Sequence, residues 1–321
     1  MVTIASADGQ ELRAMDYIGY DFENSNVKAD FEIEILLSDW QEIPAEARIY
    51  RPGTEYGGIF KWLDTNTKTR RIIAGGYTWR GMMRNKVIEP PSGEDYATDI
   101  GDVNDIIKAR VEKYLGGLFT GASPIGVSVS YQYKRYCTLE AGLTDMLATV
   151  GYKPRIEYND ELKKVVVDAV PIVDFTEKEL SSDMSADYHV IQNRGSVNHL
   201  ICLGSGQLSQ RIVVHLYTDE KGNISRTPTF TGTDEITAVY DFTAADEEQL
   251  IENGTEQLKT LQKRNSLSMN VEGGQVGIGD IVGGRDYITG IAMRAKVTGV
   301  IHKSKNGIVT TEYTISDTKE D

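Results

Sequence analysis

The residues from His199 to Ile224 contain a glycine pattern of the kind that can bind a phosphate group. Gly204-Ser205-Gly206 follows an apolar run, as the glycines of a dinucleotide-binding loop do. That loop also needs a third glycine, where this chain has Ser209, and a helix whose N-terminal amides hold the pyrophosphate. The residues 212–217 are instead apolar, β-branched or aromatic, with no helical period. The sequence therefore predicts a β-hairpin here and no nucleotide site.

Histidine and cysteine are the residue types that would bind a metal or carry out redox chemistry. The four histidines do not pair at metal-ligand spacing, although His199 and His215 flank the hairpin and could face each other across it. Cys137 and Cys202 lie in apolar surroundings and have no CxxC partner, so we expect two reduced, buried thiols. No metal and no other cofactor is expected.

Catalytic motifs do not select an active site. The chain has no G-x-S-x-G elbow, no H-E-x-x-H and no Walker loop. Folding could bring together two carboxylates of the kind that cleave sugars, but nothing in the sequence distinguishes one pair among 48 acidic residues. We therefore expect a protein that is not an enzyme. A cell-wall hydrolase stays open as an alternative.

The charge of the chain argues against a nucleic-acid-binding protein. The 321 residues carry a formal net charge of −14, whereas such proteins need lysine and arginine to displace the counterions of phosphate. The acids cluster in 174–187 and 241–256, which we expect to be solvated faces. The apolar runs are far shorter than the roughly 20 residues that span a bilayer, and the N-terminus has no secretory signal. We expect synthesis in the cytoplasm and no binding to membranes.

The elements that must position these residues are mostly short strands. In the first part of the chain Phe31, Ile33 and Ile35 alternate with glutamates, which is typical of an antiparallel strand with one solvated face. Gly75-Gly76 interrupts a later strand and indicates a bulge or a tight corner. We expect residues 1–89 to form a small β-barrel.

The period of the apolar residues changes after Pro90 to Gly93, the clearest boundary in the chain. Residues 94–187 are predicted to form an α+β domain, with a helix that begins after Asp102 and another that begins near Thr138. Residues 188–321 are predicted to form a second barrel, closed by the 199–217 hairpin and carrying an inserted helix, 244–263. The predicted fold class is mainly β, with two small antiparallel β-barrel domains separated by an α+β domain.

Three local patterns in this order resemble the tail hub, or baseplate hub, proteins of tailed bacteriophages and of phage-like particles. The first runs from 57–59 through 72–75 to Trp79-Arg80. The second is 203–206 followed by Arg211 and the turn near Gly222, and the third is the helix 246–261 leading into 279–282. Together the patterns span roughly residues 20–315, and their order and spacing carry the resemblance.

The resemblance implies a structural protein. In such hubs a trimer presents six similar barrels, which match a six-fold tail tube on one side and a three-fold spike or tip on the other. The implied partners are two further copies, a tail tube protein, distal tail or baseplate proteins, and a spike or tip protein. DNA would pass through the lumen without specific binding. The implied location is the virion tail, and a host-surface-binding module of the tail tip is the alternative.

The resemblance and the glycine pattern together predict which residues support assembly. We assign structural or assembly roles to Gly58, Gly75, Trp79, Gly204, Gly206, Arg211, Gly279 and Asp280. Gly279→Val is expected to damage assembly, because a β-branched side chain would block close approach of the strands. From charge alone, Asp241, Asp246 and Glu247 are assigned to the lumen.

Overall fold

The computed structural model describes residues 1–16, 19–25, 28–175, 187–191, 195–219, 222–261, 266–270, 276–285, 292–305 and 307–317. The chain forms two compact units. The first is Met1–Tyr188 with Ser268–Ile315, and the second is His189–Leu267 with Ser316–Asp321. The domain boundaries expected at 89, 94 and 187 stay predictions.

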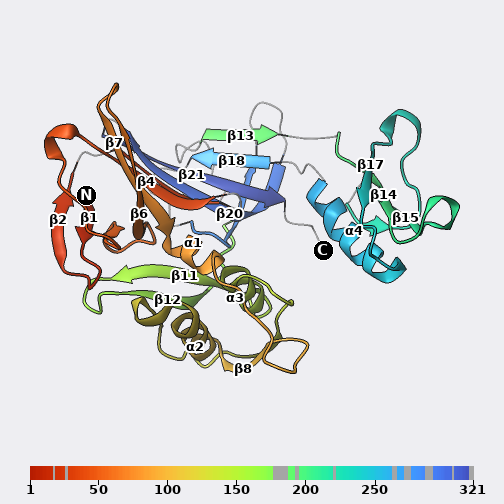
Figure 1. Ribbon diagram of the computed structural model, residues 1–321, viewed down its shortest axis with the longest axis horizontal. Coiled ribbons are helices and arrows are strands. Elements are labelled where there is room, and N and C mark those ends of the chain that lie inside the picture. The colour runs from red at the N-terminus through yellow and green to blue at the C-terminus, as the bar shows by residue number, and fades with distance from the viewer. Residues whose placement is uncertain are drawn as a thin grey trace. The chain divides into compact units, whose positions relative to one another are not determined.

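The large sheet takes strands from both ends of the sequence (Figure 1). In spatial order its strands are β13 (Asp187–Ile191), β18 (Ser266–Asn270), β21 (Ile308–Asp317), β20 (Ala292–Lys305), β3 (Gly19–Asn24), β4 (Ala29–Ile35), β7 (Arg71–Thr78), β6 (Gly57–Asn66), β5 (Arg48–Tyr50), β1 (Val2–Ala5) and β2 (Glu11–Met15), and β19 (Ile281–Arg285) pairs with β20. The pairing of β20 with β3 is antiparallel and places His302 opposite Phe22. Strands close to the two termini are thus direct neighbours.

Alternating side chains build the core of this sheet. Phe31, Ile33 and Ile35 of β4 are all buried, and Glu34 between them is exposed, which confirms the predicted one-sided strand. They pack with Phe22 and Ile49 in one apolar cluster. Burial of such side chains contributes roughly 1.5–3 kcal/mol each, so this cluster is a main source of the unit's stability.

The α+β part of the first unit packs around a second apolar cluster, which also takes in Ala5, Tyr50 and Ile59 of the large sheet. Its elements are α1 (Trp79–Arg84), β8 (Thr98–Asp102), α2 (Val103–Leu115), β9 (Phe119–Gly121), β10 (Ser128–Gln132), α3 (Leu139–Ala148), β11 (Tyr152–Asn159) and β12 (Lys164–Pro171). Asp102 and Thr138 cap α2 and α3 through their side chains, as their positions before each helix predict. β11 and β12 form an antiparallel hairpin, and β9 pairs with β12 in parallel.

The second unit is a four-stranded sheet with one helix. Its strands are β14 (His199–Leu203), β15 (Val213–Thr218), β16 (Ile224–Ser225) and β17 (Thr237–Asp241), and its helix is α4 (Glu247–Leu261). β14 and β15 form the predicted antiparallel hairpin. Leu250 and Leu258 of α4 pack on Cys202 and Leu216 of the sheet. Gly254 allows this contact, because a Cβ there would lie 2.5 Å from Cys202 Sγ.

Three predictions need correction. The protein is mainly β with an α+β part, but within the described residues no sheet closes into a barrel, because β20 and β21 extend the sheet that β3 and β4 begin. The 199–217 hairpin closes no second barrel, since it pairs with β16 and β17. The helix expected at 244–263 begins at Glu247, because Asp246 caps it, and residues 262–263 lie outside the described ones. The short helix α1 was not predicted.

Candidate assembly sites

Two of the predicted glycines lie on neighbouring strands where the backbone leaves no room for a side chain. A Cβ at Gly58 would lie 2.0 Å from the carbonyl oxygen of Tyr77, and a Cβ at Gly75 would lie 2.1 Å from Trp62 Cζ2. Gly75 faces Trp62 at the point where the register of β6 against β7 shifts, which is the bulge that the sequence predicts. The two glycines therefore let Trp62 and the β6–β7 crossing approach closely.

Trp79 joins the large sheet to the α+β part. It begins α1, whose N-cap Thr78 accepts a hydrogen bond from the Gly81 amide, and its side chain is fully buried. Its ring stacks on Tyr158 at 5.8 Å between centroids and meets Phe119 edge-on at 6.3 Å. The indole thus fills the space between β7 and the β9–β12 layer, which supports a structural role.

Arg80, the next residue, is a buried charge that our residue assignments omitted. Its guanidinium lies 3.1 Å from Glu55 and 3.2 Å from Glu140, and its side chain is 2% exposed. Burial alone would lower the pKa of Arg80, but the two carboxylates outweigh it and the pKa is raised. The two glutamates are far from Arg80 in sequence and from each other, so no local pattern could have revealed this contact.

Asp280 connects three segments of the first unit. Its side chain is 1% exposed and lies 2.5 Å from Lys153 Nζ of β11. It also accepts hydrogen bonds from the amides of Gly277 at 2.8 Å and of Val173 at 2.9 Å. A carboxylate that accepts several such bonds fixes the backbone around it. Asp280 thus holds the segment before β19 against the β11–β12 hairpin.

Gly279 makes the turn that delivers Asp280. Its φ is +100°, a conformation that side-chain-bearing residues rarely adopt, and its amide donates to the Val297 carbonyl at 2.8 Å. A Cβ at Gly279 would lie 3.0 Å from Lys153 Cβ. Next to Asp280, Ile281 at the start of β19 forms a parallel β-bridge with Asp174. The two predicted residues therefore act together at one junction.

Four predicted residues of the second unit come together at the start of the β14–β15 connection. Arg211 donates to the Gly204 carbonyl at 3.1 Å and forms an ion pair with Asp241 at 2.5 Å. A Cβ at Gly206 would lie 2.4 Å from the Gln210 carbonyl oxygen. The chain then passes through a short turn, 208–210, into β15, so the loop leads into a strand and not into the helix that a dinucleotide-binding loop requires. The arrangement stabilises the predicted hairpin.

The remaining residues assigned to the lumen have local partners. Asp246 caps α4 by accepting from the Gln249 amide at 2.9 Å. Glu247 lies 2.9 Å from Arg226, and both side chains are 57% exposed. Asp241 pairs with Arg211, as above. Each of the three acidic side chains therefore has a partner nearby in the second unit. Their assignment to a lumen stays a prediction.

The three histidine side chains that the structure describes lie in two separate places. His199 Nε2 and His215 Nδ1 lie 2.8 Å apart, so the two rings do face each other across the hairpin, and Glu235 lies 2.6 Å from His199 Nδ1. In the first unit, His302 stacks on Tyr56 at 4.2 Å and contacts Arg51. Within the described ranges no group of three or more His, Cys, Asp or Glu side chains is arranged to hold a metal ion.

Burial governs the titration of His302. Its side chain is 6% exposed, and burial together with the nearby Arg51 charge lowers the pKa of His302 to about 4. Its Nδ1 lies 2.9 Å from the Thr311 hydroxyl, and its Nε2 lies 3.2 Å from the Tyr20 hydroxyl. The imidazole is therefore neutral near pH 7 and belongs to the packed interior.

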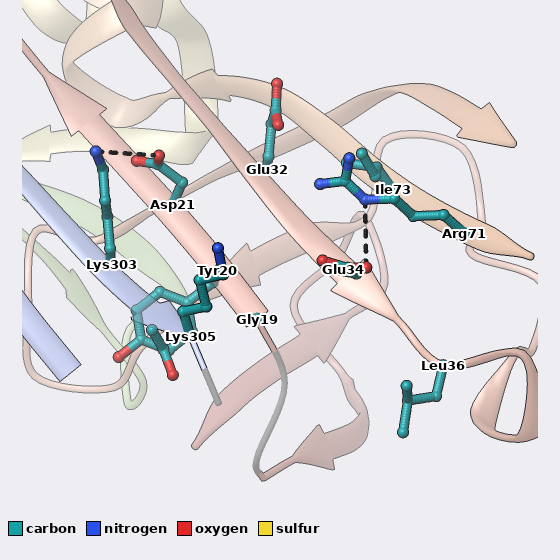
Figure 2. Close-up of a pocket in the computed structure, with 11 residues that line it drawn as sticks. Gly19, Tyr20, Asp21, Glu32, Glu34, Leu36, Arg71, Ile73, Lys303 and Lys305 are labelled. Carbon is teal, nitrogen blue, oxygen red and sulfur yellow. Dashed lines mark ion pairs between the residues drawn. The ribbon is translucent and has the colours of Figure 1, made fainter. Parts of the chain in front are cut away.

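A depression of about 520 Å³ lies on the polar face of strands β3, β4, β7 and β20. Figure 2 shows Lys303 directed at Asp21, 3.7 Å away, and Arg71 directed at Glu34, 3.2 Å away. Burial raises the pKa of Asp21, and the Lys303 charge opposes that rise. The lining has three acidic and three basic side chains, so its charge favours neither an anionic nor a cationic ligand. Two of its basic side chains are already paired with acidic side chains of neighbouring strands.

Comparison with solved structures finds three tail proteins that are similar to this chain over nearly its whole length. The 43 kDa tail protein of prophage MuSo2 from Shewanella oneidensis matches with a TM-score of 0.51 and 11% identity, over 98% of each chain. The tail protein from Neisseria meningitidis MC58 matches with a TM-score of 0.48 and 16% identity, over 98% of this chain and 96% of that one. Prophage tail protein gp18 from Listeria monocytogenes EGD-e matches with a TM-score of 0.45 and 14% identity, over 100% of this chain and 95% of that one.

Sequence comparisons add nothing to this result, since no family model and no curated protein matches the chain. In the part of the chain that the structure describes, no helix is long and apolar enough to cross a membrane. At 11% identity the likeness to the Shewanella protein concerns the fold, and it extends over nearly the whole of both chains. The chain therefore shares its fold with this prophage tail protein.

Proposed function

We propose that the chain is a structural component of the tail of a phage or a phage-like particle, located at the baseplate or tail tip. The observation that carries this proposal is the shared fold with the Shewanella prophage tail protein over 98% of both chains. The protein would be made in the cytoplasm of the bacterial host and would act through its surfaces, without an enzymatic activity.

The finer proposal is a trimeric hub. Three copies would form a closed ring that adapts a six-fold tail tube to a three-fold spike or tip, with distal tail or baseplate proteins around it. The β-rich parts would make most contacts between copies, and the α+β part, 94–187, would lie more peripherally. DNA would pass through the ring without specific contacts, which agrees with a net charge of −14.

The internal contacts of the first unit suit such a role. Asp280 and Arg80 are charged, almost fully buried and bonded to partners from distant segments. Removal of one partner from a buried ion pair typically costs several kcal/mol. Contacts of this kind keep the parts of a unit in one arrangement, as a ring element under mechanical load requires.

The test is to locate the chain in purified tails. We would fuse a small tag to the chain, purify tails from the producing host, label the tag with gold particles and measure the copy number by quantitative mass spectrometry. The expected result is label at the end of the tail distant from the capsid, with three copies per tail. Tails that lack the chain would refute the structural role.

A second measurement separates the alternatives. Light scattering of the purified chain, alone and mixed with the tail tube protein, should give a trimer or a complex with the tube. If the chain is present in tails and also degrades cell wall in a zymogram, the result would support the alternative that it is a cell-wall hydrolase. Label on fibres away from the tube axis would favour the host-surface-binding module.

A further inference from the structure

The hairpin of β6 and β7 extends beyond its neighbours in the large sheet (Figure 1). β5 pairs with β6 only as far as Ile59, and β4 pairs with β7 only from Ile72 onward. Every residue from 61 to 71 is exposed. We call residues 61–71 the arm. Its β6 strand presents a free edge over residues 61–66, where the described chain supplies no neighbour on the outer side.

The arm is held in one conformation by contacts within the hairpin. The Asn66 side-chain oxygen accepts hydrogen bonds from the amides of Lys68 and Thr69, both at 3.0 Å, which orders the tip. At the base, the Trp62 indole lies against the backbone of Gly75. An ordered arm loses little conformational entropy when it binds, and this favours a role in binding.

The arm differs from the rest of the chain in charge and in exposed apolar surface. It carries four basic residues and one acidic residue, in a chain whose net charge is −14. Within the described residues, Lys68 and Arg70 at the tip make no ion pair. Trp62 is 37% exposed and Leu63 is 42% exposed. Tryptophan and arginine are enriched in protein interfaces, and the arm has both types exposed.

We propose that the arm binds an acidic surface on a second copy of this chain, whose net charge is −14. Two arms would repel each other, so the arm cannot be its own partner, and the contact must join different surfaces on the two copies. When copies join through this contact head to tail, they close into a ring if the rotation fits a whole number of copies. The ring rests on the proposed function, whereas the arm contact itself can be tested on the purified chain.

The test compares two double variants of the full chain by sedimentation equilibrium. Lys68→Glu with Arg70→Glu reverses the tip of the arm. Lys86→Glu with Lys108→Glu is the matched control, because it changes the net charge equally at two exposed lysines of the α+β part. Both variants should fold, which circular dichroism and thermal unfolding will verify.

The wild-type chain should associate at up to about 100 µM, and the arm variant should associate at least about tenfold more weakly. The control should stay within about twofold of the wild type, and added salt should weaken wild-type association. An equimolar mixture of wild type and arm variant should still form mixed dimers, because the variant keeps its acidic surface.

Several outcomes would overturn the proposal. They are a wild-type chain that stays monomeric at about 100 µM, equal weakening of both double variants, unchanged association of the arm variant, or failure of the mixture to form mixed dimers. Binding of duplex DNA through the arm, with no self-association, would also overturn it. None of these results decides whether the chain is present in tails. The labelling experiment tests the proposed function separately.

Discussion

At the scale of single residues, a few buried polar side chains connect distant parts of the first unit. Asp280 is the clearest case, because one carboxylate accepts from Lys153 and from two backbone amides. The sequence singled out Gly279 and Asp280 only through a family resemblance. Lys153 and Val173 are more than 100 residues away, so no local pattern could predict that they meet Asp280.

Asp280→Asn should lower the free energy of unfolding by about 3–5 kcal/mol. The new amide group would direct its hydrogens at donors, and Lys153, whose side chain is 11% exposed, would lose its counter-charge. The matched control is Asp145→Asn, which removes an ion pair with Lys134. The Asp145 side chain is 45% exposed and that of Lys134 is 79% exposed, so this substitution should cost less than about 1 kcal/mol. Urea titrations compare the two. Equal losses would contradict a special role for Asp280.

His302 should make stability depend on pH in the acidic range. Its folded-state pKa is about 4 and its ordinary value is 6.5. Between these values the unfolded chain binds more protons, so stability is fully present above about pH 6.5 and falls as the pH drops toward 4, by roughly 2–3 kcal/mol for this group.

Thermal unfolding of wild type and His302→Gln from pH 7 to pH 4 isolates this contribution, since the carboxylates are common to both proteins. The difference in stability between them should shrink as the pH falls, because only the wild type must protonate a buried imidazole. A constant difference over the whole range would show that His302 does not titrate as its surroundings imply.

At the scale of elements, α4 illustrates how packing overrides helix propensity. Its apolar stripe and its start could be predicted to within three residues, since both depend on local sequence. Gly254 looked unfavourable in a helix, and only the contact with Cys202 explains it. The strands were also predicted well where side chains alternate, as in β4. Their partners were not, because the pairing of β20 with β3 depends on the whole chain.

Gly254→Ala should destabilise the second unit by about 1–3 kcal/mol, even though alanine normally favours a helix by about 1 kcal/mol over glycine. The new Cβ would lie 2.5 Å from Cys202 Sγ and 3.0 Å from Leu216 Cδ1. In a Cys202→Ala background the sulfur is absent, so the same change should cost much less or stabilise. A double-mutant cycle measured by denaturant unfolding gives the coupling. Zero coupling would contradict this account of Gly254.

At the scale of the whole molecule, most of the second unit, His189–Leu267, is inserted between two segments of the first. β13 and β18 lie at the two ends of this insertion, and the two strands are neighbours in the large sheet. The second unit also has its own apolar cluster between α4 and its sheet. A unit with its own core can in principle fold alone.

Replacement of residues 192–265 by a short Gly/Ser linker should therefore leave the first unit folded. The shortened chain should keep its β-rich circular dichroism and unfold in one cooperative transition within a few degrees of the corresponding wild-type transition. The isolated segment 195–261 should fold with lower stability, since domains of about 60 residues are marginal. Loss of cooperativity in the shortened chain would show that the first unit depends on the second.

The pairing of β3 with β20 also affects how the protein is made. Tyr20 and His302, which meet across these strands, are 282 residues apart. At about 5–20 residues per second, a ribosome needs roughly 15–60 seconds to synthesise the second strand after the first. During that time one edge of β3 lacks its neighbouring strand and can pair incorrectly. Nascent chains must therefore be kept from pairing with one another until translation has passed residue 305.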